Sequence, residues 1–255
     1  MKELRERVAV VTGAGSGIGR AIAETLAGEG VRLVVADVHR ERLVEVATKL
    51  GALAVPTDVS RADEVEQLAA RAFETHGAVH VLVNNAGVGG GGAAWETAQA
   101  EWERVLAINL WGPIYGVRAF VPRMLLQNAP AHVVNVASMA GHTCHPGMAA
   151  YNVSKHGVVA LSETLAHDLA IRGAPIKVSC LCPGFVRTRI AESAPPALDP
   201  MMAAMMRAAI ETGIPPEEVA AQVVAAIRED RFWVFTHPHF LKAVRIRMED
   251  ILEQR

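Results

Sequence analysis

The chain has 255 residues, of which 51% are hydrophobic, and its formal net charge at pH 7 is −2. This length and apolar content suit one large domain with a buried core better than two small domains. The near-neutral charge provides no field that would attract nucleic acid, and no apolar run approaches the roughly 20 residues of a membrane-spanning helix.

The cysteines and the N-terminal segment indicate a cellular compartment. Cys144, Cys180 and Cys182 are too few, and odd in number, for a disulfide framework, which fits a reducing environment. We interpret Cys180 and Cys182 as small apolar residues of a strand, because a metal site would need further ligands nearby. The opening segment MKELRERVAV has no apolar run behind its charges and so predicts no signal peptide. We therefore expect a cytoplasmic protein.

Short β-branched runs alternate with helical patterns along most of the chain. The predicted strands cover residues 7–13, 32–37, 53–60, 79–87, 132–138, 176–184 and 232–236, and the predicted helices cover residues 19–30, 39–51, 62–77, 100–112 and 149–173. The strands are apolar without clear alternation, as expected when both faces of a sheet are buried. The pattern predicts an α/β fold, with a doubly wound, Rossmann-type parallel sheet of about seven strands and helices on both faces, in one domain over residues 1–255.

The segment VTGAGSGIGR joins the first strand to the first helix. Its glycines, Gly13, Gly15, Gly17 and Gly19, allow backbone N–H groups to approach a pyrophosphate, and the helix N-terminus adds positive potential. The spacing is T-G-x-x-x-G-x-G and differs from the common G-x-G-x-x-G. The loop predicts a dinucleotide site at the start of the domain.

Asp37 ends the second strand, roughly 20 residues past this loop, and bears on the choice of cofactor. A carboxylate in that place can hydrogen-bond a ribose 2′-hydroxyl and would repel a 2′-phosphate. Ser16 and Val38 are not basic, and we interpret Arg40, at the start of a helix, as solvated. We therefore expect NAD as the cofactor, with NADP as the alternative.

Further motifs follow in order along the chain. They are TGAGSGIG at 12–19, DV at 58–59, NNAG at 84–87, Asn109, Ser138, YNVSK at 151–155 and PGFVRT at 183–188. Together they make the chain resemble the short-chain dehydrogenase/reductase family, of the type with about 250 residues, over roughly residues 7 to 190. The resemblance implies an enzyme that transfers a hydride between NAD(H) and the carbinol or carbonyl carbon of a secondary alcohol or ketone.

The resemblance also implies roles for individual residues. The catalytic residues would be Asn109, Ser138, Tyr151 and Lys155. The cofactor would be bound by Gly13, Ser16, Gly17, Ile18, Gly19, Asp37, Asp58, Val59, Asn85, Ala86, Gly87, Tyr151, Lys155, Pro183, Gly184, Val186 and Thr188. Asn84 would brace the sheet, and the protein would form a homo-oligomer, either a dimer or a tetramer.

Tyr151 and Lys155 have a physical logic of their own. Tyrosine has a reference pKa of about 10, which is too high for efficient proton exchange near neutral pH. Lys155 follows at i+4 in a predicted helix, so both side chains can face one side, and an ammonium favours the phenolate. We expect Lys155 to lower the pKa of Tyr151, which then acts as general acid or base. Ser138 ends a strand, where α/β sheets bind ligands, and its hydroxyl could hold the substrate oxygen.

Asn109 precedes Pro113 by four residues in a predicted helix. Because proline has no N–H, the carbonyl of Asn109 loses its helical partner, and we expect a kinked helix. The family resemblance implies that this asparagine anchors a water in a proton relay to Lys155.

The segment from 189 to 216 follows the last motif, and we interpret it as a lid over the substrate. Pro195, Pro196 and Pro200 predict a break in regular structure before a short helix. Met201, Met202, Met205 and Met206 form an apolar stripe, for which packing on the core is the alternative. The facing loop offers Met139, His142, His145 and Met148. We interpret His142, Cys144 and His145 as part of a substrate-facing loop and expect no metal site.

The C-terminal segment after residue 236 departs from the usual family pattern. Leu241, Val244, Met248 and Ile251 or Leu252 recur at helical spacing. The resulting apolar face could pack on its own subunit, on a neighbouring subunit or at a membrane surface, and we favour the first two. The alternative to an enzyme as a whole is a non-catalytic dinucleotide sensor on the same fold, because fold does not fix function.

Overall fold

One parallel sheet forms the centre of the protein, whose computed structural model describes residues 1–193 and 200–255. Within those residues seven strands run in the order β3-β2-β1-β4-β5-β6-β7, and all neighbours are parallel. The strands are β1 (Val8–Thr12), β2 (Arg32–Asp37), β3 (Leu53–Pro56), β4 (Val81–Asn84), β5 (Ala131–Val136), β6 (Ile176–Cys182) and β7 (Trp233–Phe235). The predicted doubly wound sheet is confirmed.

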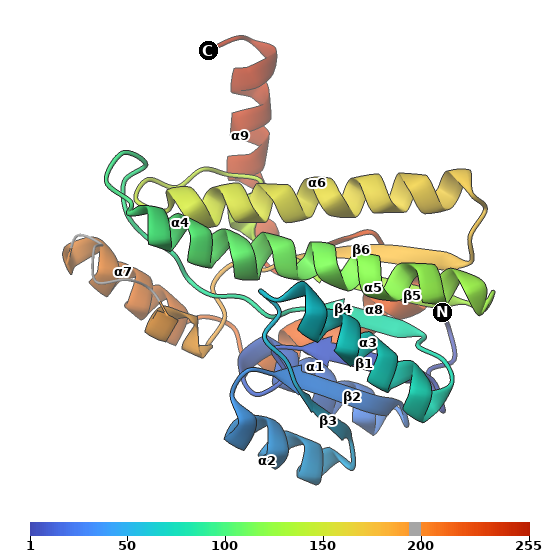
Figure 1. Cartoon of the computed structure of the whole chain (residues 1–255). Helices are drawn as coiled ribbons and strands as arrows, with labels where there is room; N and C mark the ends of the chain where they lie inside the picture. Colours follow the sequence, from blue (N-terminus) through green and yellow to red (C-terminus); the bar gives the residue numbers. More distant parts are fainter. Residues whose placement is uncertain (194–199) are drawn as a thin grey trace.

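Helices cover both faces of the sheet and make three layers (Figure 1). One face carries α1 (Gly17–Gly28), α2 (Arg40–Leu50) and α8 (Pro216–Glu229). The other carries α3 (Ala62–His76), α5 (Gly112–Leu126) and α6 (Ala149–Ile171). The chain also forms α4 (Gln99–Leu106), α7 (Pro200–Glu211) and α9 (Leu241–Leu252).

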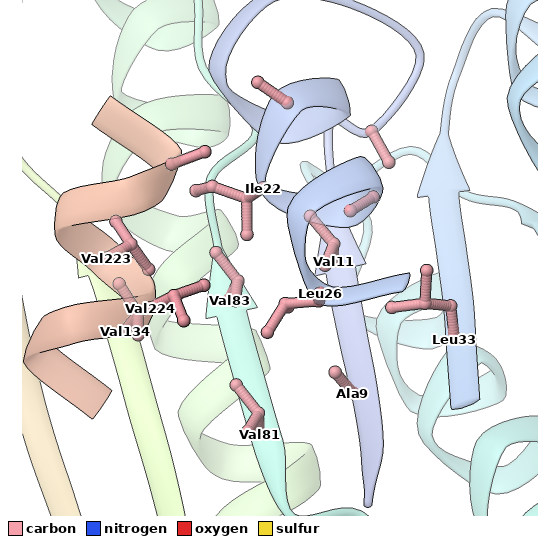
Figure 2. Close-up of a cluster of buried hydrophobic side chains, with 14 of the residues drawn as sticks. Ala9, Val11, Ile22, Leu26, Leu33, Val81, Val83, Val134, Val223 and Val224 are labelled. Atoms are coloured by element: carbon pink, nitrogen blue, oxygen red, sulfur yellow. The ribbon is translucent and has the colours of Figure 1, made fainter. Parts of the chain in front are cut away.

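The strands are apolar on both sides because each side meets a helical layer. Ala9 and Val11 of β1 belong to the cluster under α1 and α8, whereas Val8 and Val10 belong to the cluster under α3 and α5. Figure 2 shows the first cluster, in which side chains of β1, β2, β4 and β5 meet those of α1 and α8. The complete burial of β1 explains why its sequence shows no polar alternation.

The strand order reverses direction at β1, and this reversal places the site. The chain runs outward from β1 to β2 and β3, then returns to pair β4 on the other side of β1. In open parallel sheets the loops diverge at such a point and leave a crevice outside the carboxyl ends of the strands. The motifs at 12–19 and 84–87 both lie at this junction.

The helix predicted over residues 100–112 is longer than expected and contains an irregular turn. It begins as α4, passes through a π-helical turn, η1 (Ala107–Trp111), and continues without a break as α5. The N–H of Gly112 bonds to the carbonyl of Ala107, five residues back. Since Pro113 lacks an N–H, the ladder widens here, which is the physical basis of the irregularity predicted from the sequence.

The proposed lid contains two short helices, η3 (Arg189–Ser193) and α7. The helix predicted after the prolines is present as α7, and Pro200 is its first residue. Pro195 and Pro196 lie outside the described residues. An isolated bridge joins Val186, just before the segment, to Ile214 near its end. Its role as a lid stays a prediction.

The last part of the chain forms β7, then the short helix η4 (Pro238–Phe240), then α9. The strand predicted at 232–236 is confirmed and pairs with β6 at the sheet edge. None of the residues of α9 is buried, and Figure 1 shows this helix standing away from the body of the protein. Over the described residues, no helix combines the length and the apolar character needed to span a membrane.

Candidate active site

A cavity of about 1180 Å³ runs along the carboxyl edge of the sheet. It is bordered by the segments that follow β1 to β6 and by residues of α7 and α9. Most predicted site residues lie in its wall: Gly13, Ser16, Gly17, Ile18, Asp37, Asp58, Val59, Asn85, Ala86, Gly87, Ser138, Tyr151, Lys155, Pro183, Gly184, Val186 and Thr188. Of the predicted set, only Gly19 and Asn109 are not part of the wall.

The glycine loop allows a close approach of backbone segments. Gly13 has a φ of +63°, and a Cβ there would lie 2.7 Å from the Cα of Ala86. A Cβ on Gly19 would lie 2.3 Å from the carbonyl oxygen of Gly13 and 2.3 Å from Nδ2 of Asn85. Gly19 therefore serves the packing of α1 against the ends of β1 and β4, which explains why it does not face the cavity.

Thr12 and Asn85 connect the two strands at this junction. The Thr12 hydroxyl accepts from the N–H groups of Asn85 (3.0 Å) and Ala86 (3.1 Å) and donates to the carbonyl of Val83. Nδ2 of Asn85 donates to the carbonyl of Thr12 at 2.8 Å. Thr12 belongs to the TGAGSGIG motif, and no sequence signal marked the role of its hydroxyl, which fixes the loop that would face the dinucleotide.

A buried polar chain braces β4, β5 and α6. Nδ2 of Asn84 donates to Oδ1 of Asn135 at 2.8 Å, and Nδ2 of Asn135 donates to the hydroxyl of Ser162 at 3.0 Å. All three residues are buried. The structure thus gives Asn84 the bracing contact that the family resemblance implied, and adds two partners that no sequence motif marked.

Asp37 is buried and already holds two backbone groups. Its Oδ2 accepts from the N–H of Gly15 at 2.9 Å, and its Oδ1 accepts from the N–H of His39 at 2.8 Å. These bonds fix the carboxylate at the end of the cavity that Val38 and Arg42 also line. The sequence pointed to Arg40 instead of Arg42. Arg42 lies two residues further along α2, on a different side of the helix, and lines the cavity.

Ser138, Tyr151 and Lys155 meet at the middle of the cavity. Ser138 caps η2 (Met139–Gly141), accepting from the N–H of Ala140 at 3.1 Å. Nζ of Lys155 donates to the carbonyl of Val136 at 3.0 Å and lies 5.6 Å from the ring centroid of Tyr151. A phenol, a hydroxyl and an ammonium therefore converge from α6 and the end of β5.

Burial shifts the two titrating side chains in opposite directions. Burial raises the pKa of Tyr151, and a hydrogen bond with Ser138 opposes it. Burial lowers the pKa of Lys155 to about 8, against a smaller opposing influence of Cys180 and Cys182. The i+4 spacing predicted that Lys155 lowers the pKa of Tyr151. In the protein without ligand, burial has the larger effect and raises this pKa, because loss of water disfavours the phenolate.

Asn109 lies behind the cavity wall in the π-helical turn and is fully buried. Its Oδ1 accepts from the N–H of Val88 at 2.8 Å, and its Nδ2 donates to the carbonyl of Val88 at 2.9 Å. A Cβ on Gly87 would lie 3.3 Å from Oδ1 of Asn109 and 3.7 Å from Nζ of Lys155. The side chain of Asn109 thus clamps the segment after β4 beside the lysine.

His142 does not face the substrate region, which corrects the interpretation of its loop. Its Nε2 lies 3.2 Å from Sγ of Cys182, and its ring packs at 5.2 Å from the rings of Trp233 and Phe235. Burial lowers its pKa to about 4, so it is neutral at physiological pH. His142 packs inward against the aromatic residues of β7, which are distant in sequence. His145 of the same loop lines the cavity.

The end of the cavity bordered by α7 and α9 is largely apolar. Its wall there includes Met139, Pro146, Met148, Phe185, Ile190, Met201, Met205, Met206, Ala209, Ile210, Phe240 and Ala243. Arg189 also lies there, but its Nε is paired with Glu192 at 2.9 Å. Over residues 1–193 and 200–255, no group of three or more His, Cys, Asp or Glu side chains could hold a metal ion.

The segment after β7 completes this wall, which the sequence did not indicate. The N–H of Gly184 donates to Nδ1 of His237 at 3.1 Å, and the rings of His237 and Phe240 stack at 5.5 Å. A Cβ on Gly184 would lie 2.6 Å from the ring of Phe240. The absence of a side chain at Gly184 therefore allows η4 to close over the segment that would seat the nicotinamide.

Comparison with known proteins agrees with this geometry. A sequence profile described as short chain dehydrogenase matches residues 7–199. The chain is 38% identical over 254 residues to 1-deoxy-11-beta-hydroxypentalenate dehydrogenase of Streptomyces exfoliatus, covering 97% of this chain and 87% of that protein. A short chain dehydrogenase/reductase from Burkholderia phymatum, solved in complex with NAD, is 45% identical, with a TM-score of 0.95. The match covers 100% of this chain and 97% of that chain. A variant of actinorhodin polyketide ketoreductase, solved with NADPH, is 33% identical, with a TM-score of 0.79. The match covers 92% of this chain and 97% of that chain.

The lowered pKa of Lys155 predicts a pH dependence of stability. Folding is disfavoured while Lys155 is protonated, because its pKa falls from 10.5 to about 8 on burial. The unfolded chain binds more protons between these values, so stability rises with pH across that window. In urea unfolding without cofactor, the free energy of unfolding of the wild type relative to Lys155→Met should rise by about 2 kcal/mol from pH 7 to 9.5. A constant difference would contradict the shift.

Proposed function

Because the chain belongs to the short-chain dehydrogenase family, and is thus a nicotinamide-dependent oxidoreductase of CH–OH and C=O groups, we propose that it is NAD-dependent and interconverts apolar secondary alcohols and ketones. The observation that carries this proposal is the convergence of Ser138, Tyr151 and Lys155 on a largely apolar cavity beside the glycine loop. The alternative is a carbonyl reductase that uses NADP.

The residues around the cavity fit a dinucleotide. Gly17 has a φ of +54°, and a Cβ there would lie 3.1 Å from Thr188, so its absence leaves room between the start of α1 and the segment after β6. The first N–H groups of an α-helix have no partner within the helix, so the N-terminus of α1 suits a pyrophosphate, and the carboxylate of Asp37 suits a ribose hydroxyl. When bound, the nicotinamide supplies or accepts the hydride.

Tyr151 carries the proton in the proposed reaction. Its raised pKa keeps the phenol protonated, which suits donation to a carbonyl oxygen held also by the Ser138 hydroxyl. In the reverse direction the phenolate must form, and the nearby Lys155, with a pKa of about 8, is mostly an ammonium at pH 7 and favours it. Lys155 in turn is held by the carbonyl of Val136.

Asn109 is proposed as a positioning residue behind this pair. Its carboxamide clamps Val88, which keeps the segment after β4 close to Lys155. Pro113 provides no N–H to the carbonyl of Asn109, and we propose that this carbonyl holds a water for proton exchange with the lysine.

NAD is favoured over NADP by the buried carboxylate of Asp37. Two backbone N–H groups hold the carboxylate in place, so a 2′-phosphate bound beside it would meet its negative charge. One relative was solved with NAD and another with NADPH, so relatives of both kinds exist. Arg42 lies at the same end of the cavity, and its positive charge is what favours the alternative, NADP.

The wider setting follows from the family and the composition. We propose a homo-oligomer, a dimer or a tetramer, with a small-molecule substrate and no nucleic acid partner. The thiols of Cys144, Cys180 and Cys182 are free, which is compatible with a reducing cytoplasm, where we place the protein.

Tyr151→Phe should abolish most turnover while leaving the fold and NADH binding in place. The change removes the proposed proton donor and keeps the ring, and general acid–base help contributes about 10²–10⁴-fold. The measurement is NADH absorbance for turnover, with NADH fluorescence for binding. The control is Tyr115→Phe, the other tyrosine, whose ring stacks on Trp111 outside the cavity wall. Turnover within about twofold of the wild type in Tyr151→Phe would refute the role of Tyr151 as the proton carrier.

The ratio of specificity constants for NAD and NADP should exceed about tenfold, a difference of about 1.4 kcal/mol. Asp37→Ala should shrink this ratio, because it removes the charge that repels a 2′-phosphate. The variant also loses the bonds to Gly15 and His39, so use of both cofactors should fall and only the ratio is diagnostic. Arg42→Ala should raise the ratio. A wild type that prefers NADP contradicts the assignment.

A panel of alcohols and ketones should show preference for neutral apolar substrates and rejection of hydroxy acids. The double substitution of Met205→Ala and Met206→Ala should change the order of preference, since both side chains line the cavity. Leu126→Ala, on the exposed side of α5, is the matched control. A preference for carboxylated substrates, or an unchanged order in the double variant, would show that the proposed lid does not select the substrate.

A further inference from the structure

His237 is a buried histidine that no step of the proposed reaction uses. It follows β7 and precedes η4, and its ring lies against the segment after β6. A Cβ on Gly184 would lie 2.8 Å from Cγ of His237 and 2.6 Å from the ring of Phe240. The rings of His237 and Phe240 stack at 5.5 Å, so two aromatic side chains pack together against the backbone of Gly184.

The hydrogen bonds of His237 fix which ring nitrogen carries the proton. The N–H of Gly184 donates to Nδ1 at 3.1 Å, so this nitrogen is unprotonated. The hydroxyl of Thr236 lies 2.7 Å from the same nitrogen and for the same reason can only donate to it. The N–H of Gly184 therefore depends on a neutral imidazole whose proton is on Nε2.

Protonation of His237 removes the acceptor of Gly184. An imidazolium carries a proton on both nitrogens, so the N–H of Nδ1 would face the N–H of Gly184. Two donors cannot satisfy each other, and leaving a donor in this place without an acceptor is unfavourable. The segment after β6 then loses its hydrogen bond to the region that follows β7.

The surroundings of His237 favour the neutral ring. Burial lowers the pKa of His237 below its ordinary value of 6.5, and the nearby His239 lowers it further. A backbone hydrogen bond with Phe185 and the charge of Glu218, on α8, oppose this shift. The ring is therefore neutral at pH 7 and gains its second proton only in acid.

We propose that His237 is a positioning residue for the nicotinamide half of the cofactor, and that its protonation weakens cofactor binding in acid. The inference rests on the proposed placement of the nicotinamide against Pro183 and Gly184, which both line the cavity. His237 is not part of the cavity wall, so it acts through its contacts with Gly184 and Phe240, which are.

The dissociation constants of NAD and ADP-ribose, measured by calorimetry against pH, test this role. ADP-ribose lacks only the nicotinamide, so its binding does not depend on the segment at Gly184. The constant for NAD divided by that for ADP-ribose should rise at least about threefold from about pH 7.5 to about pH 5, because a group that must be neutral weakens binding up to about tenfold per pH unit below its pKa. A ratio that stays constant in the wild type overturns the proposal. If NADP binds more tightly, 2′-phospho-ADP-ribose is its counterpart, so a wrong choice of cofactor leaves the test intact.

His237→Asn isolates the titrating ring. Its Oδ1 is two bonds from Cβ, as Nδ1 is, and accepts from Gly184 at every pH, so the ratio should no longer change with pH. His237→Ala removes the acceptor and should raise the ratio about two- to tenfold at neutral pH. The matched control is His239→Asn, which changes an exposed neighbour outside the cavity wall and should keep the pH dependence. An unchanged pH dependence in His237→Asn contradicts the proposal.

Nitrogen NMR of histidine-labelled wild type measures the same coupling without any variant. The chain has ten histidines, and the signals of His237 are identified by the nuclear Overhauser contact of its ring with the N–H of Gly184. Saturating NAD should lower the pKa of His237, because a ligand that binds the neutral form better displaces the proton, whereas ADP-ribose should leave it unchanged. An equal pKa with and without NAD would show that the contacts of His237 only stabilise the fold. Turnover is not measured, so this result leaves the proposed role of Tyr151 untouched.

Discussion

The hydrogen bonds that join Thr12 to the start of the segment after β4 fix the geometry on which the site depends. One hydroxyl accepts from two successive N–H groups, those of Asn85 and Ala86, at the point where the strand order reverses. Asn85 returns a bond to the carbonyl of Thr12. The backbone hydrogen-bond ladder between β1 and β4 ends at this edge, because the two strands diverge into loops there. The bonds of Thr12 and Asn85 hold the two segments together beyond it.

The same constraint explains why glycine is needed in the first loop. With β1 and β4 held this close, α1 begins where any Cβ at Gly19 would strike the carbonyl of Gly13. The start of α1 therefore lies next to the strand ends, and Ser16, Gly17 and Ile18 there line the cavity. Packing at the junction and anion binding are two consequences of one close approach.

Burial also sets the electrostatics of the proposed acid–base pair. Removing water disfavours the phenolate of Tyr151 and the ammonium of Lys155 alike, so the pKa of Tyr151 rises and the pKa of Lys155 falls to about 8. Asn109 and the carbonyl of Val136 hold the surrounding backbone and the lysine, so the pair is positioned before any ligand arrives.

The sequence by itself determined the parallel sheet, its helical layers and the residues that gather at its carboxyl edge. Those features follow from local pattern: β-branched runs buried on both faces, a glycine turn, and an i+4 pair on a helix. Pro113 likewise predicted an irregular helix, because its missing N–H is a local property.

The tertiary structure decided the features that depend on partners distant in sequence. His142 packs inward because its ring contacts the rings of Trp233 and Phe235 of β7 and the thiol of Cys182. Arg42 reaches the cavity through the placement of α2, and Phe240 closes over Gly184 because η4 returns to that segment. Burial likewise decided that the pKa of Tyr151 rises, and the i+4 spacing of Tyr151 and Lys155 does not predict burial. Local spacing fixes which side chains share a face, but the water they lose is set only when the rest of the chain packs around them.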